Sequence, residues 1–358
     1  MRSVLLRTFL ACAATVSTAL ALPIDFNLTT LATNATDSQL INPWGIAASA
    51  SSPLWIGSNG SGVSEIYTAA GVKNALVVTI PGDGSVTGVA FNGTSDFHAD
   101  NFLFVSEDGT VSGWRSALGT AAETLEAANA SDVYKGLTLD TAGGFNYALL
   151  ANFRAGTVDV LKGNAADPNL AGNFTDPTIP AGYAPFDVQN LNGVIYVTYA
   201  EQDALKHDEV DGSGLGYVDA FDLNGNLISR LVGNGALNAP WGLAIAPAGF
   251  GDLGGDLLVG NFGDGTINAY NATTGVFQET LHNTSGNPIT IDGLWALHFG
   301  SGSANGGSTN SLFVTAGPNG ESGGLFARID PVPEPGTWLF AGLGLVTVIA
   351  RRRTISPD

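Results

Sequence analysis

Asn42-Pro43-Trp44-Gly45-Ile46-Ala47 returns later in the chain as Ala239-Pro240-Trp241-Gly242-Leu243-Ala244. Four weaker copies read TGVAF (87–91), KGLTL (135–139), APFDV (184–188) and DGLWAL (292–297). Their glycine or equivalent positions, 45, 88, 136, 186, 242 and 293, lie 43 to 56 residues apart. A repeat at this period indicates an array of similar supersecondary units.

Each copy is followed by further segments that alternate apolar and polar residues. A β-rich run comes next in every unit, as in LWIGSNG (54–60), then a third strand such as TINAYN (266–271). A fourth is visible in several units, as in LISRLVG (227–233). Four strands per unit at this period predict an all-β, six-bladed β-propeller of four-stranded blades. The repeats resemble those of NHL-repeat proteins. An eight-bladed ring or two stacked sandwiches is the alternative.

The ends of the repeat region indicate how the ring closes. Unit six ends near Ile329 without a fourth strand, while IDFNLTTL (24–31) forms an unassigned strand before unit one. Pairing the two would complete the last blade and remove exposed edges. The predicted organisation is a leader over 1–21, a propeller over 22–331 and a tail over 332–358, which contains a short hydrophobic helix.

The composition excludes several classes of function. The 48 glycines and 13% charged residues suit short strands and tight turns. Between leader and tail stand 8 basic and 30 acidic residues, a net charge of about −22, which repels nucleic acid. Cations, basic proteins and neutral glycans stay open as partners. The one cysteine, Cys12, lies in the leader, so the sequence predicts no disulfide after its removal.

The first 21 residues have the pattern of a secretory signal peptide. Arg2 and Arg7 precede an apolar stretch, and Ala19-Leu20-Ala21 offers small residues for cleavage. A buried helix at the start of the fold, or a lipoprotein leader at Cys12, is the alternative. The sequence therefore predicts export.

The tail combines a Pro-Glu-Pro hinge, a short apolar run and three arginines. The run, 337–350, would rise about 21 Å as a helix, short of a ~30 Å hydrocarbon core. This length favours transient contact with the inner membrane, with arginines held in the cytoplasm. The parts that form the predicted sorting signal are Val332, Pro333, Glu334, Pro335, Arg351, Arg352 and Arg353.

These residues look like the PEP-CTERM sorting signal of exported bacterial proteins. The resemblance implies processing by an exosortase-type membrane enzyme and delivery to the cell envelope, the cell surface or the exterior. An ordinary C-terminal anchor is the alternative. Together with the repeats over 24–330, the tail is similar to a family of exported bacterial PEP-CTERM proteins. This resemblance implies an architecture and a destination but no chemistry.

One face of the predicted ring should collect the polar residues. In a propeller the loops between blades and the loops after each second strand share a face, where ligands often bind over the channel. Besides the loop between 201 and 216, the face is expected to hold Asn42, Asn59, Glu107, Asp108, Asn152, Asn238, Asn261 and Asp264. Trp44, Trp241 and Trp295 are predicted to pack in the core, with sugar stacking as the alternative.

The loop EQDALKHDEVDGSG, which begins at Glu201, is the most distinctive candidate. The residues that could bind a partner or Ca²⁺ there are Asp203, Lys206, His207, Asp208, Glu209 and Asp211. Closely spaced carboxylates suit Ca²⁺, although the spacing is not that of an EF-hand. A solvated acidic loop is the alternative.

An enzymatic hypothesis rests on resemblance. Six-bladed lactonases and gluconolactonases resemble this architecture and hold a central Ca²⁺ with Glu, Asn and Asp, which here suggests Asn152, Asp187, Asn261 and Asp292. The four histidines show no zinc spacing, and no G-x-S-x-G elbow is present. The main hypothesis is a non-enzymatic propeller that binds a protein or polysaccharide at the cell surface or in the extracellular matrix. The alternative is a Ca²⁺-dependent lactone or ester hydrolase.

Overall fold

The computed structural model describes residues 25–332. The predicted signal peptide, the apolar helix of the tail and the sorting residues from Pro333 onward lie outside the described residues. Within 25–332, none of the helices is long and apolar enough to cross a membrane.

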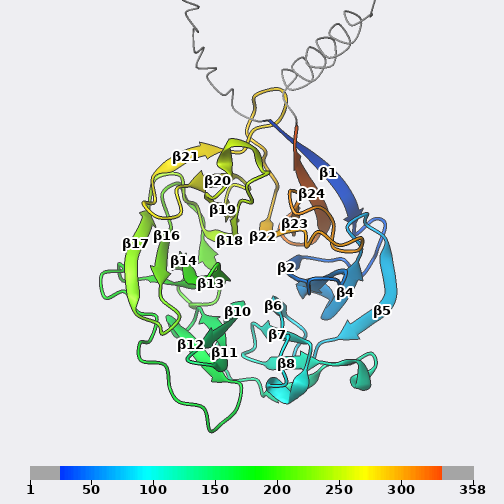
Figure 1. Ribbon diagram of the computed structural model, residues 1–358, viewed down its shortest axis with the longest axis vertical. Helices are drawn as coiled ribbons and strands as arrows, with labels where there is room; N and C mark the ends of the chain where they lie inside the picture. Colours follow the sequence, from blue (N-terminus) through cyan, green and yellow to red (C-terminus); the bar gives the residue numbers. More distant parts are fainter. Residues whose placement is uncertain (1–24, 333–358) are drawn as a thin grey trace, which may run out of the picture.

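Six β-sheets surround a central axis, as predicted (Figure 1). The innermost strands are β2 (Pro43–Ala47), β6 (Val86–Phe91), β10 (Tyr134–Ala142), β13 (Tyr183–Leu191), β18 (Pro240–Ile245) and β22 (Leu294–Phe299). The second strands are β3 (Leu54–Ser58), β7 (Phe102–Ser106), β11 (Phe145–Asn152), β14 (Val194–Gln202), β19 (Leu257–Asn261) and β23 (Leu312–Ala316). We number the blades one to six from β2 to β22.

The outer strands complete the sheets. The third strands are β4 (Val63–Tyr67), β8 (Val111–Trp114), β12 (Thr157–Lys162), β16 (Tyr217–Phe221), β20 (Ile267–Tyr270) and β24 (Leu325–Pro331). The outermost strands are β5 (Lys73–Thr79), β9 (Glu123–Glu126), β17 (Leu227–Gly233), β21 (Phe277–Thr280) and β1 (Phe26–Thr33). Every pairing within a sheet is antiparallel, and a short β15 (Glu209–Val210) pairs with β14.

The predicted closure of the ring is confirmed. β1 pairs with β24 from Phe26 opposite Pro331 to Thr33 opposite Leu325. Both ends of the described chain therefore leave from blade six (Figure 1). The first strand becomes the outermost strand of the last blade, which covers the edge of β24.

Blade three departs from the four-stranded pattern, because its sheet holds only β10, β11 and β12. The chain from 163 to 182, where a fourth strand would run, contains Pro168, Pro177 and Pro180 and forms no strand. Proline has no N–H to donate to a ladder, so this segment is poorly suited to a sheet.

A β-bulge in the innermost strand recurs in all six blades. The pairing with the second strand skips at the same place in every sheet. The equivalent residues at the bulge, all buried, are Trp44, Thr87, Lys135, Phe186, Trp241 and Trp295. A bulge inserts an extra residue and redirects its side chain, here toward the axis. We call these residues the axial ring.

The bulges correct the alignment of two repeats. In blade six, Trp295 takes the place of Trp44, so Ala296 rather than Gly293 stands at the glycine position. In blade four, the equivalent of Gly45 is Asp187 and not residue 186. The sequence alignment of unit six relied on the dipeptide Gly293-Leu294, which resembles the Gly-Leu of other units. Pairing with the second strand sets the register instead, and it places the equivalent glycine position three residues later.

The repeated glycines allow neighbouring innermost strands to approach closely. A Cβ on Gly45 would lie 2.7 Å from the carbonyl oxygen of Thr87, and one on Gly242 only 2.4 Å from that of Trp295. Real Cβ atoms do not approach backbone this closely, so each glycine marks a blade-to-blade contact with no room for a side chain.

The three tryptophans form the apolar centre of the ring, as predicted. Trp44 stacks on Trp295 with 3.5 Å between ring centroids, and Trp241 meets both edge-on. Phe262 also stacks on Trp295, with 4.2 Å between ring centroids. Such aromatic contacts add stabilisation beyond burial, and the three indoles belong to one buried core cluster.

Gly242→Ala should lower the free energy of unfolding by about 1–3 kcal/mol, because the new methyl overlaps the backbone of blade six. Urea unfolding followed by tryptophan fluorescence measures this change. Gly93→Ala is the matched control, since its Cβ would meet only the edge of the Phe91 ring at 3.3 Å. Equal effects of the two substitutions would contradict the proposed contact.

Candidate functional site at the channel mouth

Lys135 is the one charged member of the axial ring, and it organises the mouth of the channel. Its side chain is 1% exposed, and its ammonium lies 2.5 Å from a Glu107 oxygen and 3.4 Å from an Asp208 oxygen. The ammonium also lies 5.1 Å from the centre of the Trp44 ring. Burial opposes the charge, but the surrounding carboxylates dominate and raise the pKa of Lys135.

The loop after β14 folds over this mouth. The Asp203 carboxylate accepts bonds from the His207 and Asp208 amides, at 2.8 and 3.3 Å, and Lys206 adopts a left-handed conformation in the turn. β15 then pairs with the end of β14, which directs Asp208 and Glu209 toward Lys135. The structure thus brings Asp208 and Glu209 to Lys135, with Asp203 and His207 in the turn that holds them.

The other predicted loop residues have different surroundings. Lys206 is exposed at the turn. Asp211 lies against the Gly263 turn of blade five, near Asp264, and its charge also acts on Glu209.

Carboxylates outnumber the single ammonium at the mouth. Burial raises the pKa of Glu209 to about 7, and it also raises the pKa of Glu321, although Lys135 acts in the opposite direction on both. For Asp208 burial is outweighed by Lys135 and His207, so its pKa is lowered. Two of the carboxyl groups at the mouth therefore bind protons more readily than usual, because burial disfavours their charged form.

An open cleft of about 490 Å³ adjoins the mouth on the side of blades two and three. Its polar lining consists of Asp83, Ser85, Glu107, Asp108, Asp132, Arg154 and His207. We call it the acidic cleft. Glu107, His207 and Asp208 could together hold a metal ion, because their ligand atoms lie within 4.8 Å of one another. In this structure the Lys135 ammonium already contacts both carboxylates of that group.

The asparagines expected at this face have two structural roles: some support residues at the channel mouth, and others hold loops in place. Asn42 accepts a bond from the Trp295 indole at 2.9 Å and donates one to Glu321 at 2.6 Å, and Asn59 donates to Glu107 at 3.0 Å. These two support the mouth. Asn238 instead accepts a bond from the Gly212 amide and so holds the end of the loop after β14.

The structure does not bring Asn152, Asp187, Asn261 and Asp292 together. Asn152 and Asn261 play the same structural part in blades three and five: each ends a second strand and accepts a bond from the incoming chain, at Val133 and Asn238. Asp292 is exposed and accepts a bond from the Asn319 amide. Asp187 lies inside the channel.

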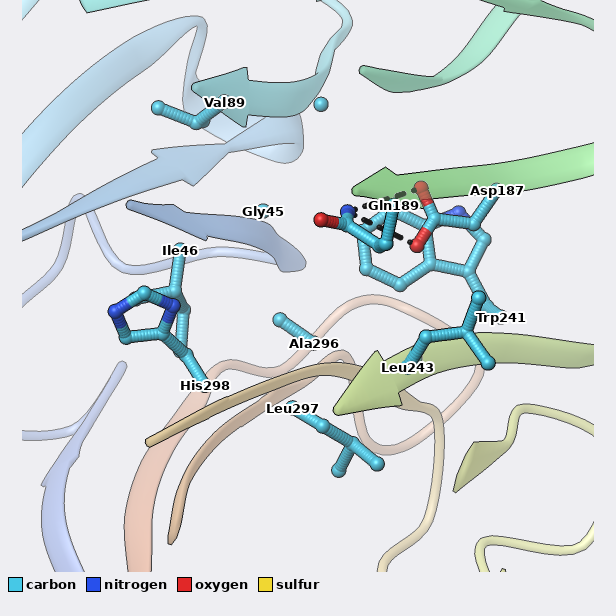
Figure 2. Close-up of a pocket in the computed structure, with 12 residues that line it drawn as sticks. Gly45, Ile46, Val89, Asp187, Gln189, Trp241, Leu243, Ala296, Leu297 and His298 are labelled. Carbon is cyan, nitrogen blue, oxygen red and sulfur yellow. Dashed lines mark hydrogen bonds between the residues drawn. The ribbon is translucent and has the colours of Figure 1, made fainter. Parts of the chain in front are cut away.

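Beside Trp241 of the axial ring, Asp187 lines a small cavity of about 30 Å³ (Figure 2). Gln189 donates to both oxygens of this buried carboxylate, at 3.4 and 3.2 Å. His298 lies across the cavity, and burial lowers its pKa to about 4. Burial raises the pKa of Asp187 well above its usual value. The cavity has room for about one water molecule.

Sequence reasoning missed Lys135, Glu321, Gln189 and His298. A signal for Lys135 was present, because the aligned repeats place a charged residue where other units have tryptophan. Glu321 is contributed by a loop without repeat character, and only the folded ring places it beside Asn42.

Comparison with known proteins assigns the chain to a family. It is 32% identical over 317 residues to uncharacterized protein R648 of Acanthamoeba polyphaga mimivirus, covering 82% of this chain and 76% of that protein. It is also 30% identical over 282 residues to uncharacterized protein L690 of the same virus, covering 73% and 74%. The chain belongs to the family of these two proteins.

Residues 331–353 match the PEP-CTERM protein-sorting motif, as the sequence predicted. The protein is therefore exported, and its motif marks it for exosortase-dependent delivery to the cell surface or the exterior.

Solved structures share the fold of this family member. A glucose dehydrogenase superposes with a TM-score of 0.52 at 14% identity, covering 86% of this chain and 99% of the dehydrogenase. A streptogramin B lyase gives a TM-score of 0.50 at 10% identity, covering 86% and 98%. At these identities the similarity is one of architecture alone.

Lys135→Met should destabilise the protein by about 3–5 kcal/mol, because it leaves the partly buried carboxylates at the mouth without a counter-ion. Chemical unfolding at pH 7 measures the loss. Lys162→Met, on the outer strand of blade three, is the control and should change stability by less than about 0.5 kcal/mol. Similar losses in both variants would show that the mouth does not depend on the Lys135 charge.

Glu209→Gln should alter how stability depends on pH. A carboxyl group whose folded pKa is about 7 binds a proton more tightly in the folded state than in the unfolded one, so its contribution falls as pH rises from about 4.5 to 7. The variant should be more stable than wild type at pH 8, by on the order of 1 kcal/mol, since water reaches part of the side chain. Thermal unfolding at pH 5 and pH 8 tests this, and an unchanged slope would contradict it.

Proposed function

We propose that this exported propeller is a binding protein of the cell surface or extracellular matrix, and that its acidic cleft takes a positively charged segment of a partner protein. The observation that carries the proposal is the lining of the cleft, where carboxylates outnumber the single guanidinium of Arg154. The Arg154 guanidinium is itself bonded to the Ala130 carbonyl at 2.8 Å. A cleft with this charge favours a cationic ligand and speeds its approach.

The state of the channel mouth supports binding over Ca²⁺-dependent hydrolysis. The ammonium of Lys135 supplies positive charge where the alternative hypothesis would place the ion. The side-chain amides of Asn152 and Asn261, two of its suggested ligands, bond to Ala155 and Asp264 and so hold the turns after β11 and β19. Ligands already committed to turn structure would have to rearrange before they could bind a metal.

Titration of the full chain with octalysine tests the proposed cleft. Binding should weaken as salt rises, and Asp83→Asn/Asp132→Asn should lower the affinity about tenfold by removing two charges. Asp252→Asn, an exposed acid in the loop before β19, is the control and should bind as wild type. Equal affinities of the two variants would contradict the cleft. Binding of a neutral polysaccharide in place of octalysine would contradict the proposed partner charge.

Calcium titration of the full chain addresses the alternative function. Stoichiometric heat at millimolar Ca²⁺ that Asn152→Ala/Asn261→Ala abolishes would support the hydrolase hypothesis. Absence of heat would count against it.

A further inference from the structure

Blade three ends one strand earlier than the other five, and this leaves the outer edge of β12 as the border of its sheet. In the other blades the same edge of the third strand is paired, as in β16, whose Tyr217 to Phe221 face β17. The ring therefore has one position, outside β12, where a strand of the repeating architecture is missing (Figure 1).

The register identifies which backbone groups face this position. Gly163 donates its N–H to the Asn146 carbonyl, in line with the pairing of β11 and β12. In an antiparallel ladder alternate residues turn toward the partner strand, so Thr157, Asp159 and Leu161 face β11. The residues whose N–H and C=O groups point outward are Val158, Val160 and Lys162.

These outward groups make no hydrogen bond with any part of residues 25–332. The proline-containing segment after β12 does not cover them. It crosses instead to blade four, where the amides of Gly172 and Phe174 bond to the carbonyls of Asn224 and Gly225. Phe174 is buried in the core that blades three and four share. Val160 is 37% exposed and Lys162 is half-buried, whereas Val158 is buried, so the edge of β12 is open toward its second half while the sheet face beside it is closed.

Apart from Lys162 in β12 itself, the charged side chains beside the edge are acidic. Glu126 ends β9 of blade two, and partial burial together with the charges of Asp132 and Asp159 raises its pKa. Asp132 also lines the acidic cleft, so the negative surface continues from the cleft to β12. A second copy of the chain, with a net charge of −19, would be repelled from this surface, whereas a basic segment would be attracted.

We propose that the outer edge of β12 binds an extended, basic segment of a partner protein, which adds to blade three as its fourth strand. Main-chain bonds to Val158, Val160 and Lys162 would supply affinity, as in other cases of β-strand addition. Lysine or arginine side chains of that segment would face Glu126, Asp132 and Asp159. The proposal shares the partner's charge with the proposed function but rests on a separate observation, the missing strand.

An octapeptide of alternating lysine and valine is the probe, and the full chain is the protein. Val160→Pro removes an outward N–H without breaking the ladder to β11, and edge strands tolerate proline. It should weaken binding at least about tenfold. Val160→Ala keeps the N–H and should bind as wild type. In wild type, the peptide should slow hydrogen exchange at the amides of Val158, Val160 and Lys162, a readout that does not depend on the variant's folding.

The outcomes are distinguishable. No binding of the probe, equal binding by Val160→Pro, or unprotected amides would each overturn the proposal. A dimer in sedimentation that Val160→Pro dissociates would also overturn it, because a second copy would then occupy the edge. Asp83→Asn tests the cleft separately with octalysine, because Asp83 lines only the cleft whereas Asp132 borders both sites. If the cleft variant loses octalysine binding while Val160→Pro still binds the lysine–valine peptide as wild type does, the cleft is supported and the strand site is refuted.

Discussion

The close approach of neighbouring innermost strands is the constraint on which the rest of the structure depends. Gly45, Gly88 and Gly242 each stand where a Cβ would overlap the backbone of the next blade. The bulge before this point turns the preceding side chain to the axis. Six blades therefore contribute six side chains to one ring. The identity of those side chains decides which part of the channel is apolar and which part carries charge.

Five members of the axial ring are uncharged, and one is a lysine. The aromatic members pack in one buried cluster, while Lys135 draws Glu107 and Asp208 toward the mouth from blades two and four. A buried ammonium requires such partners, because its desolvation is costly. The loop after β14 is held over the mouth for the same reason. The polar face is thus organised from the core outward.

Two departures from the repeat lie on the same side of the ring. Blade four carries the long loop that covers the mouth, and blade three lacks a fourth strand. The acidic cleft adjoins both. These departures make one side of the nearly symmetric ring different from the rest, because loops and outer strands tolerate change more readily than residues at the axis.

The sequence alone determined the blade number, the closure by the first strand and the burial of the three tryptophans. These follow from local periodicity and from side chains that have no alternative to the core. The sorting motif was also readable, because it is a continuous signal. What only the tertiary structure decided was the register of blades four and six, the place of Lys135 and the open edge of β12. The four suggested metal ligands looked alike in sequence, yet two hold turns, one is exposed and Asp187 lines the buried cavity. Such differences depend on contacts between residues far apart in the chain, and repeat patterns do not encode them.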